Sequence, residues 1–123
     1  MRTSQASGYY ALLLKNFPQF KNNGIIFNEL AVLELLKNNP DKAASFFFLA
    51  AKLAPDNPDI IRNCAIYCDF NPSSVRRYLS RISRPDFPTT AKDYYSRYLK
   101  LTSARPELES ERLAVEQRLS TIR

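Results

Sequence analysis

Three asparagine–proline pairs divide the chain of 123 residues and mark where several of its helices begin. Asparagine is a favoured N-cap residue, and proline suits the first helical position, where its missing N–H costs no hydrogen bond. Each pair precedes an apolar run with helical periodicity. The sequence therefore predicts helix starts at Asn39-Pro40, Asn57-Pro58 and Asn71-Pro72.

The use of glycine supports a helical fold for the whole chain. There are 8 prolines but only 2 glycines, whereas tight β-hairpins consume glycine. No segment shows the sustained alternation of apolar and polar residues that indicates a strand. With Pro88 and Pro106 as further starts, we predict an all-α fold with helices at about 6–16, 24–37, 41–54, 58–70, 72–83, 88–101 and 106–121.

A pattern of small and aromatic residues covers residues 24–57. Aromatic, large and small residues on a first helix precede small and aromatic ones on a second: Phe27, Leu30, Ala31, Glu34, then Ala43, Phe47, Ala50 and a closing Pro55. Alanine lets two helices approach closely, and an aromatic ring fills the gap to the next hairpin. The spacing resembles the tetratricopeptide repeat (TPR). Glu34 departs from that family's pattern, which usually has a tyrosine there.

Weaker copies flank this repeat. Residues 6–18 resemble the second half of a TPR, residues 58–87 a degenerate repeat, and residues 88–123 a degenerate hairpin followed by a cap. The second helix of the degenerate repeat would pack through Val75, Leu79 and Ile82. The resemblance implies one domain of antiparallel helical hairpins, stacked as a short right-handed solenoid. A solenoid ends in an element with a polar outer face, and the final helix fits that role.

The resemblance also implies a concave groove, lined by the first helices, that receives a peptide or helix from another protein. The implied groove residues are Asn28, Val32, Leu35, Leu36, Arg62, Asn63, Ile66 and Asp69. TPR proteins that bind the terminal carboxylate of chaperone tails use lysine and asparagine on the leading helix. Val32 stands in place of the second polar contact, so that ligand is not predicted. The alternative for Val32, Leu35 and Leu36 is simple packing against the half repeat.

A basic surface is predicted late in the chain. The net charge is +6, and residues 62–105 carry essentially the whole surplus. The side chains that form this basic patch are Arg77, Arg81, Arg84, Arg97 and Lys100. Such a patch is a solvated helix face, a site for an acidic segment of a partner protein, or a site for nucleic-acid phosphates. The alternative function is therefore a helical-repeat nucleic-acid-binding protein that uses the Arg-rich segment 76–105.

Three consecutive phenylalanines, Phe46, Phe47 and Phe48, cannot all face one core, because successive helical side chains point about 100° apart. Phe47 occupies the aromatic position of the repeat, and Phe48 is expected to fill the room that neighbouring alanines leave. Phe46 lines up with Leu49 and Leu53 as an exposed apolar stripe. Either a neighbouring helix covers this stripe or another chain binds there.

The composition argues against catalysis. The chain has no histidine, the commonest general base and zinc nitrogen ligand, and 2 cysteines alone cannot complete a tetrahedral zinc site. We therefore expect neither an enzyme nor a cofactor. Cys64 and Cys68 are interpreted as small core residues in a reducing compartment.

The apolar run ALLL near the N-terminus is too short for a signal peptide or a membrane span, and Lys15 follows it at once. We expect a cytoplasmic protein. The leading hypothesis is a protein-interaction module, such as an adaptor, an assembly factor or a chaperone, that binds a protein partner. The unpaired half repeat at the N-terminus suggests a homodimer as a further alternative.

Overall fold

The computed structural model describes the backbone of residues 3–122. Over this range the chain is all-α, as predicted, with seven α-helices, two short 3-10 helices and no strand. The helices are α1 (Thr3–Asn16), α2 (Gly24–Leu36), α3 (Pro40–Leu53), α4 (Pro58–Phe70), α5 (Pro72–Leu79), α6 (Ala91–Leu101) and α7 (Glu109–Thr121). The 3-10 helices are η1 (Pro18–Asn22) and η2 (Pro106–Leu108).

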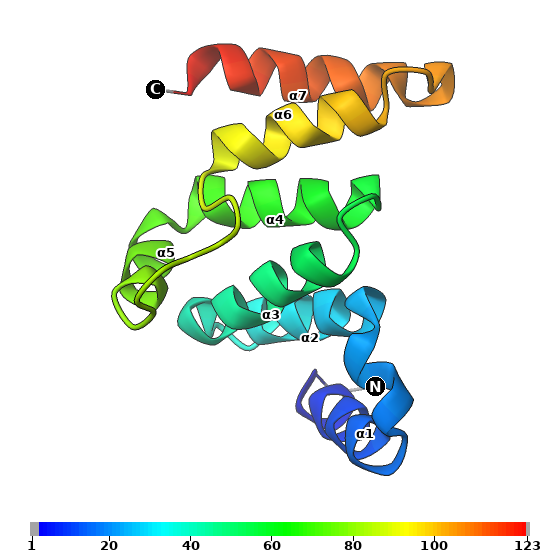
Figure 1. Ribbon diagram of the computed structural model, residues 1–123, viewed down its shortest axis with the longest axis vertical. Helices are drawn as coiled ribbons and strands as arrows, with labels where there is room; N and C mark the ends of the chain where they lie inside the picture. Colours follow the sequence, from blue (N-terminus) through cyan, green and yellow to red (C-terminus); the bar gives the residue numbers. More distant parts are fainter. Residues whose placement is uncertain (1–2, 123) are drawn as a thin grey trace.

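The helices follow one another along the long axis of the molecule (Figure 1). From the N-terminal end the order is α1, the α2–α3 hairpin, α4, α6 and α7, and α5 lies to one side. Figure 1 shows that α2 and α3 run antiparallel, as do α4 and α6, and α6 and α7.

The three asparagine–proline pairs start helices as predicted, but only one asparagine caps its helix with its side chain. The Oδ1 of Asn57 accepts hydrogen bonds from the backbone N–H groups of Asp59 and Ile60, at 3.0 and 3.2 Å. Asn39 instead donates from Nδ2 to Glu34, at 3.3 Å. Asn71 donates to the carbonyl of Tyr67, at 3.1 Å. The pairs thus fix the helix starts mainly through proline.

Four predicted helix boundaries differ from the structure by three or four residues, among them the starts of α1, at Thr3 instead of 6, and of α7, at Glu109 instead of 106. The helix expected at 72–83 ends at Leu79, after which the N–H groups of Arg81 and Ile82 bond to carbonyls three residues back and form turns. The helix expected from residue 88 begins at Ala91, because Thr90 caps it by accepting from the N–H of Asp93 at 3.2 Å. Residues 80–90 therefore form a connection without helix.

The α2–α3 hairpin is packed as closely as its small residues predict. Ala43, Ala44, Ala50 and Ala51 are all buried. The first residue of α2, Gly24, lies so near the end of α3 that an added Cβ would be 2.9 Å from the Ala50 carbonyl oxygen. A small residue is therefore required at both sides of this crossing.

Phe47 and Phe48 are core residues, as predicted. Both are 2% exposed. The ring of Phe47 stacks on Tyr67, with centroids 4.7 Å apart. The ring of Phe48 contacts Tyr78 at 5.4 Å and Phe87 at 5.2 Å. Phe48 of α3 thus packs against both α5 and the connection that follows α5.

The helix that packs along α4 is α6, whereas α5 lies mainly against α3. The buried side of α6 consists of Ala91, Tyr94, Tyr95 and Tyr98. The sequence predicts Val75, Leu79 and Ile82 as the packing residues of the second helix of a repeat; Val75 and Leu79 lie at the core cluster that also holds Cys68 of α4, although α5 contacts α3 more than α4. Tyr78 of α5 stacks on Phe48 of α3, and this aromatic contact holds α5 against α3.

Cys64 and Cys68 are free and buried in the core, as predicted. Burial raises the pKa of the Cys64 thiol well above its ordinary value. In the described part of the chain, no helix is both long and apolar enough to cross a membrane.

Candidate binding groove

A hollow of about 300 Å³ lies between α2 and α4. Val32 and Leu35 line it from α2, and Asn63, Ile66 and Phe70 line it from α4. These spacings put each set on one face of its helix, because residues three, four and seven apart share a face. We call this surface the α2–α4 groove.

Tyr67 forms the floor of the groove, and its own contacts hold it in place. Tyr67 is 1% exposed, and its ring stacks on Phe47. Its hydroxyl donates a hydrogen bond of 2.6 Å to the carbonyl of Pro40, the first residue of α3. Burial raises the pKa of Tyr67, so the phenol stays a donor at neutral pH. The groove therefore has a rigid base.

Large apolar side chains are exposed at and beside the groove. Phe70 is 68% exposed and Ile66 41%, and both line the hollow. Leu36, at the end of α2, is 69% exposed but does not line it. Adjacent exposed apolar side chains around a hollow are typical of a binding surface, whereas single ones are not.

One of the predicted groove residues, Asn28, belongs to the scaffold. It is buried, and its Oδ1 accepts a hydrogen bond of 3.3 Å from the Nδ2 of Asn63. This contact joins α2 to α4 at one end of the groove. Asn63 is thus both a lining residue and a link between the two helices.

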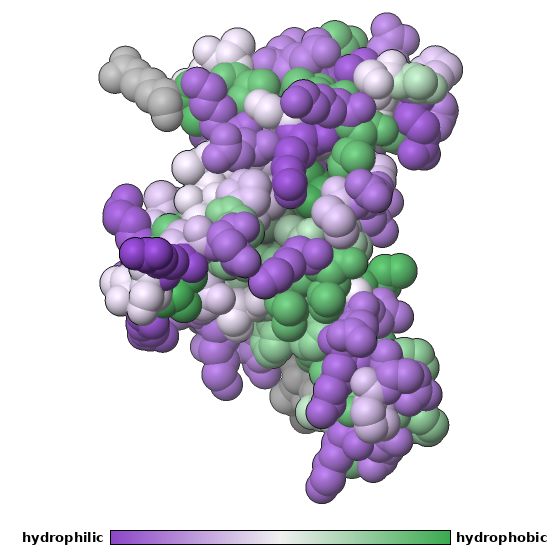
Figure 2. All heavy atoms as spheres, in the orientation of Figure 1, coloured by the Kyte–Doolittle hydropathy of each residue, from purple (hydrophilic) through white to green (hydrophobic). Residues whose placement is uncertain are grey.

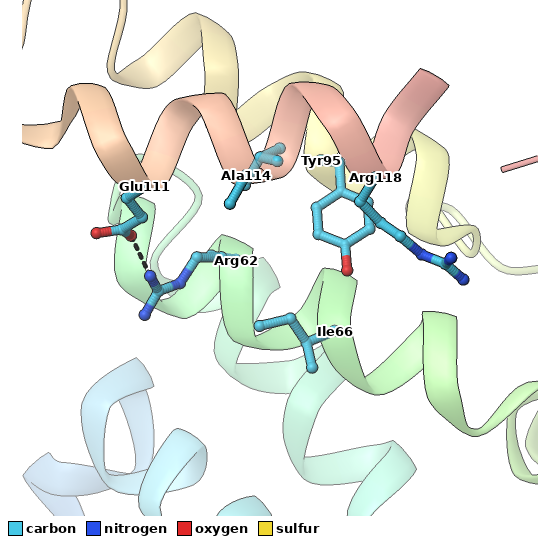
Figure 3. Close-up of a pocket in the computed structure, with 7 residues that line it drawn as sticks. Arg62, Ile66, Tyr95, Glu111, Ala114 and Arg118 are labelled. Carbon is cyan, nitrogen blue, oxygen red and sulfur yellow. Dashed lines mark ion pairs between the residues drawn. The ribbon is translucent and has the colours of Figure 1, made fainter. Parts of the chain in front are cut away.

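Two other predicted groove residues, Arg62 and Asp69, hold α7 against α4, and Figure 3 shows the contact of Arg62 with Glu111. Arg62 forms an ion pair with Glu111 of α7. Asp69 accepts two hydrogen bonds from Arg118 of α7, both 2.7 Å. The hydrogen bonds from Arg118 lower the pKa of Asp69 below its ordinary value. The prediction that both residues face a partner stays untested, but each already has an intramolecular contact.

A second hollow, of about 190 Å³, lies beneath α7 (Figure 3). Ile66 lines it as well as the α2–α4 groove, so the two hollows adjoin across one side chain. Below the Arg62–Glu111 pair, burial and the nearby carboxylate of Glu111 raise the pKa of Tyr98 to about 12. Part of the surface of α4 is thus already covered by α7 of the same chain.

Sequence reasoning missed the contribution of α7 to this surface. A signal was present, because Arg62 and Asp69 are seven apart, as are Glu111 and Arg118. Two helices that carry opposite charges at the same spacing can pair at both positions when they lie side by side. The pattern is weak, since surface charges at such spacings are common.

The predicted basic patch is divided between two surfaces. Arg77 donates two hydrogen bonds of 2.8 Å to Asp41. Arg81 lines a hollow against α3, whereas Arg97 and Lys100 line a separate one on α6. Arg84 is exposed beyond the end of α5. The five residues therefore do not form one continuous stripe along a helix.

The apolar stripe of Phe46, Leu49 and Leu53 is half-buried. All three pack against an apolar cluster that contains Phe27, and the ring of Phe46 stacks on Phe27 with centroids 6.2 Å apart. The half-buried residues of α1 at the same cluster are Tyr10, Leu13 and Leu14. Figure 2 shows apolar residues gathered in the middle of the molecule, over α3, with hydrophilic ones prominent over α1.

No known protein-family model matches the chain, and the comparison with curated proteins finds no relative. Within the described residues, no three histidine, cysteine, aspartate or glutamate side chains come together in a group that could hold a metal ion. The class defined by the structure is therefore an all-α protein with an apolar groove between α2 and α4. The likeness to the TPR stands on the sequence pattern alone.

Proposed function

We propose that this chain is a protein-interaction module, a TPR-like helical repeat that binds a peptide or helix of a partner protein in the α2–α4 groove. The observation that carries the proposal is the pair of exposed apolar side chains, Ile66 and Phe70, beside a hollow of about 300 Å³. Burial of such side chains against a partner removes apolar surface from water, which is the main driving force of association.

The groove suits an apolar side chain flanked by polar backbone. The hollow accepts the apolar group, and Ile66 and Phe70 cover it from one side. The amides of Asn63 and Asn71 lie at the lining and can bond to polar groups of the bound segment. The rigid floor formed by Tyr67 means that little ordering of the groove opposes binding. An adaptor, an assembly factor or a chaperone would use this kind of surface.

The nucleic-acid alternative is supported less well. It needs a run of free cations that follow a phosphate backbone. Arg77 is neutralised by Asp41, Arg81 lines one hollow, and Arg97 and Lys100 line another. The two free buried cysteines support a reducing compartment, and we propose a cytoplasmic location on that ground.

Affinity purification with a groove variant and a matched control tests the proposal. Tagged wild-type protein, Phe70→Asp and Leu113→Asp are expressed in the source cells, and recovered proteins are identified by mass spectrometry. Leu113 is 50% exposed on α7 and lies outside the groove lining. We expect one partner to be recovered with the wild type and with Leu113→Asp, but not with Phe70→Asp.

Both variants must give the same helical circular dichroism and thermal midpoint as the wild type. If the wild type recovers no protein at moderate salt, or if Phe70→Asp recovers the same partner equally well, the groove is not the binding site.

A further inference from the structure

A third hollow, of about 370 Å³, lies between α3 and α5 and brings together two features that the sequence separates. Arg81 of the basic patch and Phe46 of the apolar stripe both line it. Tyr78 of α5 lines it next to them, and Lys42 and Ser45 contribute from α3. We call this surface the α3–α5 hollow. It shares no lining residue with the α2–α4 groove.

The two carboxylates in the lining are already neutralised. Asp41 accepts two hydrogen bonds from Arg77 and one of 2.6 Å from the hydroxyl of Ser74. Glu34 is buried and accepts from Lys37 at 3.1 Å and from Asn39 at 3.3 Å. Neither acid therefore needs a cationic ligand.

The two cations of the lining, unlike its carboxylates, form no ion pair within the described residues. Lys42 and Arg81 are exposed, and neither forms an ion pair with any residue in the described range 3–122. Since Arg77 and Lys37 balance the two acids, Lys42 and Arg81 leave the hollow with a net positive charge. A ligand that brings negative charge satisfies them.

The walls of the hollow are aromatic and fixed. Phe46 stacks on Phe27, and Tyr78 stacks on the fully buried Phe48. Both rings are half-buried, so each presents part of its surface to the hollow. An apolar side chain that enters here contacts rings that do not need to be ordered first.

We propose that the α3–α5 hollow is a second binding site, which takes an acidic segment of a partner protein that carries a large apolar side chain next to its carboxylates. The apolar side chain packs on Phe46 and Tyr78, and the carboxylates accept hydrogen bonds from Lys42 and Arg81. This site acts independently of the α2–α4 groove. It also gives Lys42, Arg81 and Phe46 one common role.

The mixed character of the hollow favours a protein segment over other polyanions. A nucleic acid or an anionic membrane is recognised by many cations over an extended surface. Here the lining offers only two cations outside ion pairs, too few to follow the successive phosphates of a long polyanion. A short acidic segment with an apolar anchor needs only those two cations, and it also uses the aromatic walls.

The test measures binding of a fluorescein-labelled peptide, GDEFDEG, to the full chain by fluorescence anisotropy. Two control peptides replace either the phenylalanine by serine or the acids by their amides. Four proteins are compared: the wild type, the double variant Lys42→Gln with Arg81→Gln, the variant Ser45→Glu, and Arg84→Gln. Arg84 is exposed nearby but does not line the hollow, so its variant is the control for Ser45→Glu, which also changes the net charge by one unit.

We expect the double variant and Ser45→Glu each to weaken binding of the acidic peptide by about tenfold, since each removes or opposes charge-assisted contacts. Arg84→Gln should stay within about twofold, and both control peptides should bind at least several-fold more weakly. Because all substituted positions are exposed, the fold is expected to persist.

Three results overturn the proposal. One is no detectable binding of GDEFDEG at about 1 mM protein, the weakest affinity that would be meaningful. Another is an equal loss with Arg84→Gln, which would mean unspecific attraction. The third is tighter binding of oligothymidylate or of phosphatidylserine vesicles that depends on Lys42 and Arg81 in the same way. Because Phe70→Asp leaves this hollow intact, failure here and failure of the groove are distinguishable.

Discussion

Arg118 of α7 donates two hydrogen bonds of 2.7 Å to Asp69 of α4, and so fixes the last helix to the middle of the molecule. The Asp69 side chain is 5% exposed, whereas that of Arg118 is 45% exposed. The hydroxyl of Tyr95 on α6 donates to the same carboxylate at 3.0 Å. One nearly buried carboxylate thus connects three helices.

We predict that Arg118→Gln destabilises the protein by about 1–2 kcal/mol, because it leaves Asp69 nearly buried with only one strong donor. Arg105→Gln is the matched control. It breaks the exposed pair with Glu107, so its effect should stay below about 0.5 kcal/mol. Urea unfolding followed by circular dichroism measures both. Equal effects would show that Asp69 does not depend on α7.

The two glycines should respond to alanine in opposite directions. Gly24→Ala places a Cβ 2.9 Å from both the Ala50 carbonyl oxygen and the Ala54 Cβ, so the α2–α3 hairpin must shift. We expect a loss of about 1–3 kcal/mol. At Gly8, inside α1, an added Cβ meets nothing within 4 Å. Gly8→Ala should therefore stabilise by about 0.5–1 kcal/mol. Thermal midpoints that move the same way would contradict this packing.

Acid stability should depend on the pair of Asp41 and Arg77. The hydrogen bonds from Arg77 lower the pKa of Asp41 from 3.8 to about 2. A depressed pKa in the folded state means that the contribution is fully present above about pH 4 and is lost as the pH falls towards 2. The midpoint of urea unfolding should therefore fall less steeply over this window in Arg77→Gln than in the wild type. Parallel pH profiles would count against the pair.

The two thiols should differ in reactivity. Cys64 is fully buried, whereas Cys68 is 7% exposed and lines a hollow next to α5. We expect Ellman's reagent to modify Cys68 first, and Cys64 only on global unfolding. The variants Cys64→Ala and Cys68→Ala assign the two phases, and both thiols should react at similar rates in guanidinium chloride. Faster modification of Cys64 in the native protein would contradict the packing of α4 against α6.

Much of the fold could be predicted because helix starts are local. Proline fixes its own backbone angle, so Pro40, Pro58 and Pro72 mark the first residues of α3, α4 and α5 with no knowledge of their neighbours. The burial of Phe47 and Phe48 followed from periodicity, which shows which side of a helix is apolar. Both features depend only on residues close in sequence.

The pairing of helices could not be predicted in the same way. Periodicity shows that a face is buried but not which helix covers it, so the pattern of Val75, Leu79 and Ile82 does not show that α5 contacts α3 more than α4. The same limit applies to the site. Arg62 and Asp69 were expected to face a partner, and only the fold shows that Glu111 and Arg118 reach them.

The position of α5 in the chain, between α4 and its partner α6, has a consequence for the order in which the molecule folds. Residues 37–39 join α2 to α3, whereas residues 71–90 separate α4 from its partner α6. Closing the longer loop costs of the order of 1–2 kcal/mol more in chain entropy, and contacts of greater sequence separation form more slowly. We therefore expect the α2–α3 hairpin to be ordered while α6 is still leaving the ribosome, with α4 completed only afterwards.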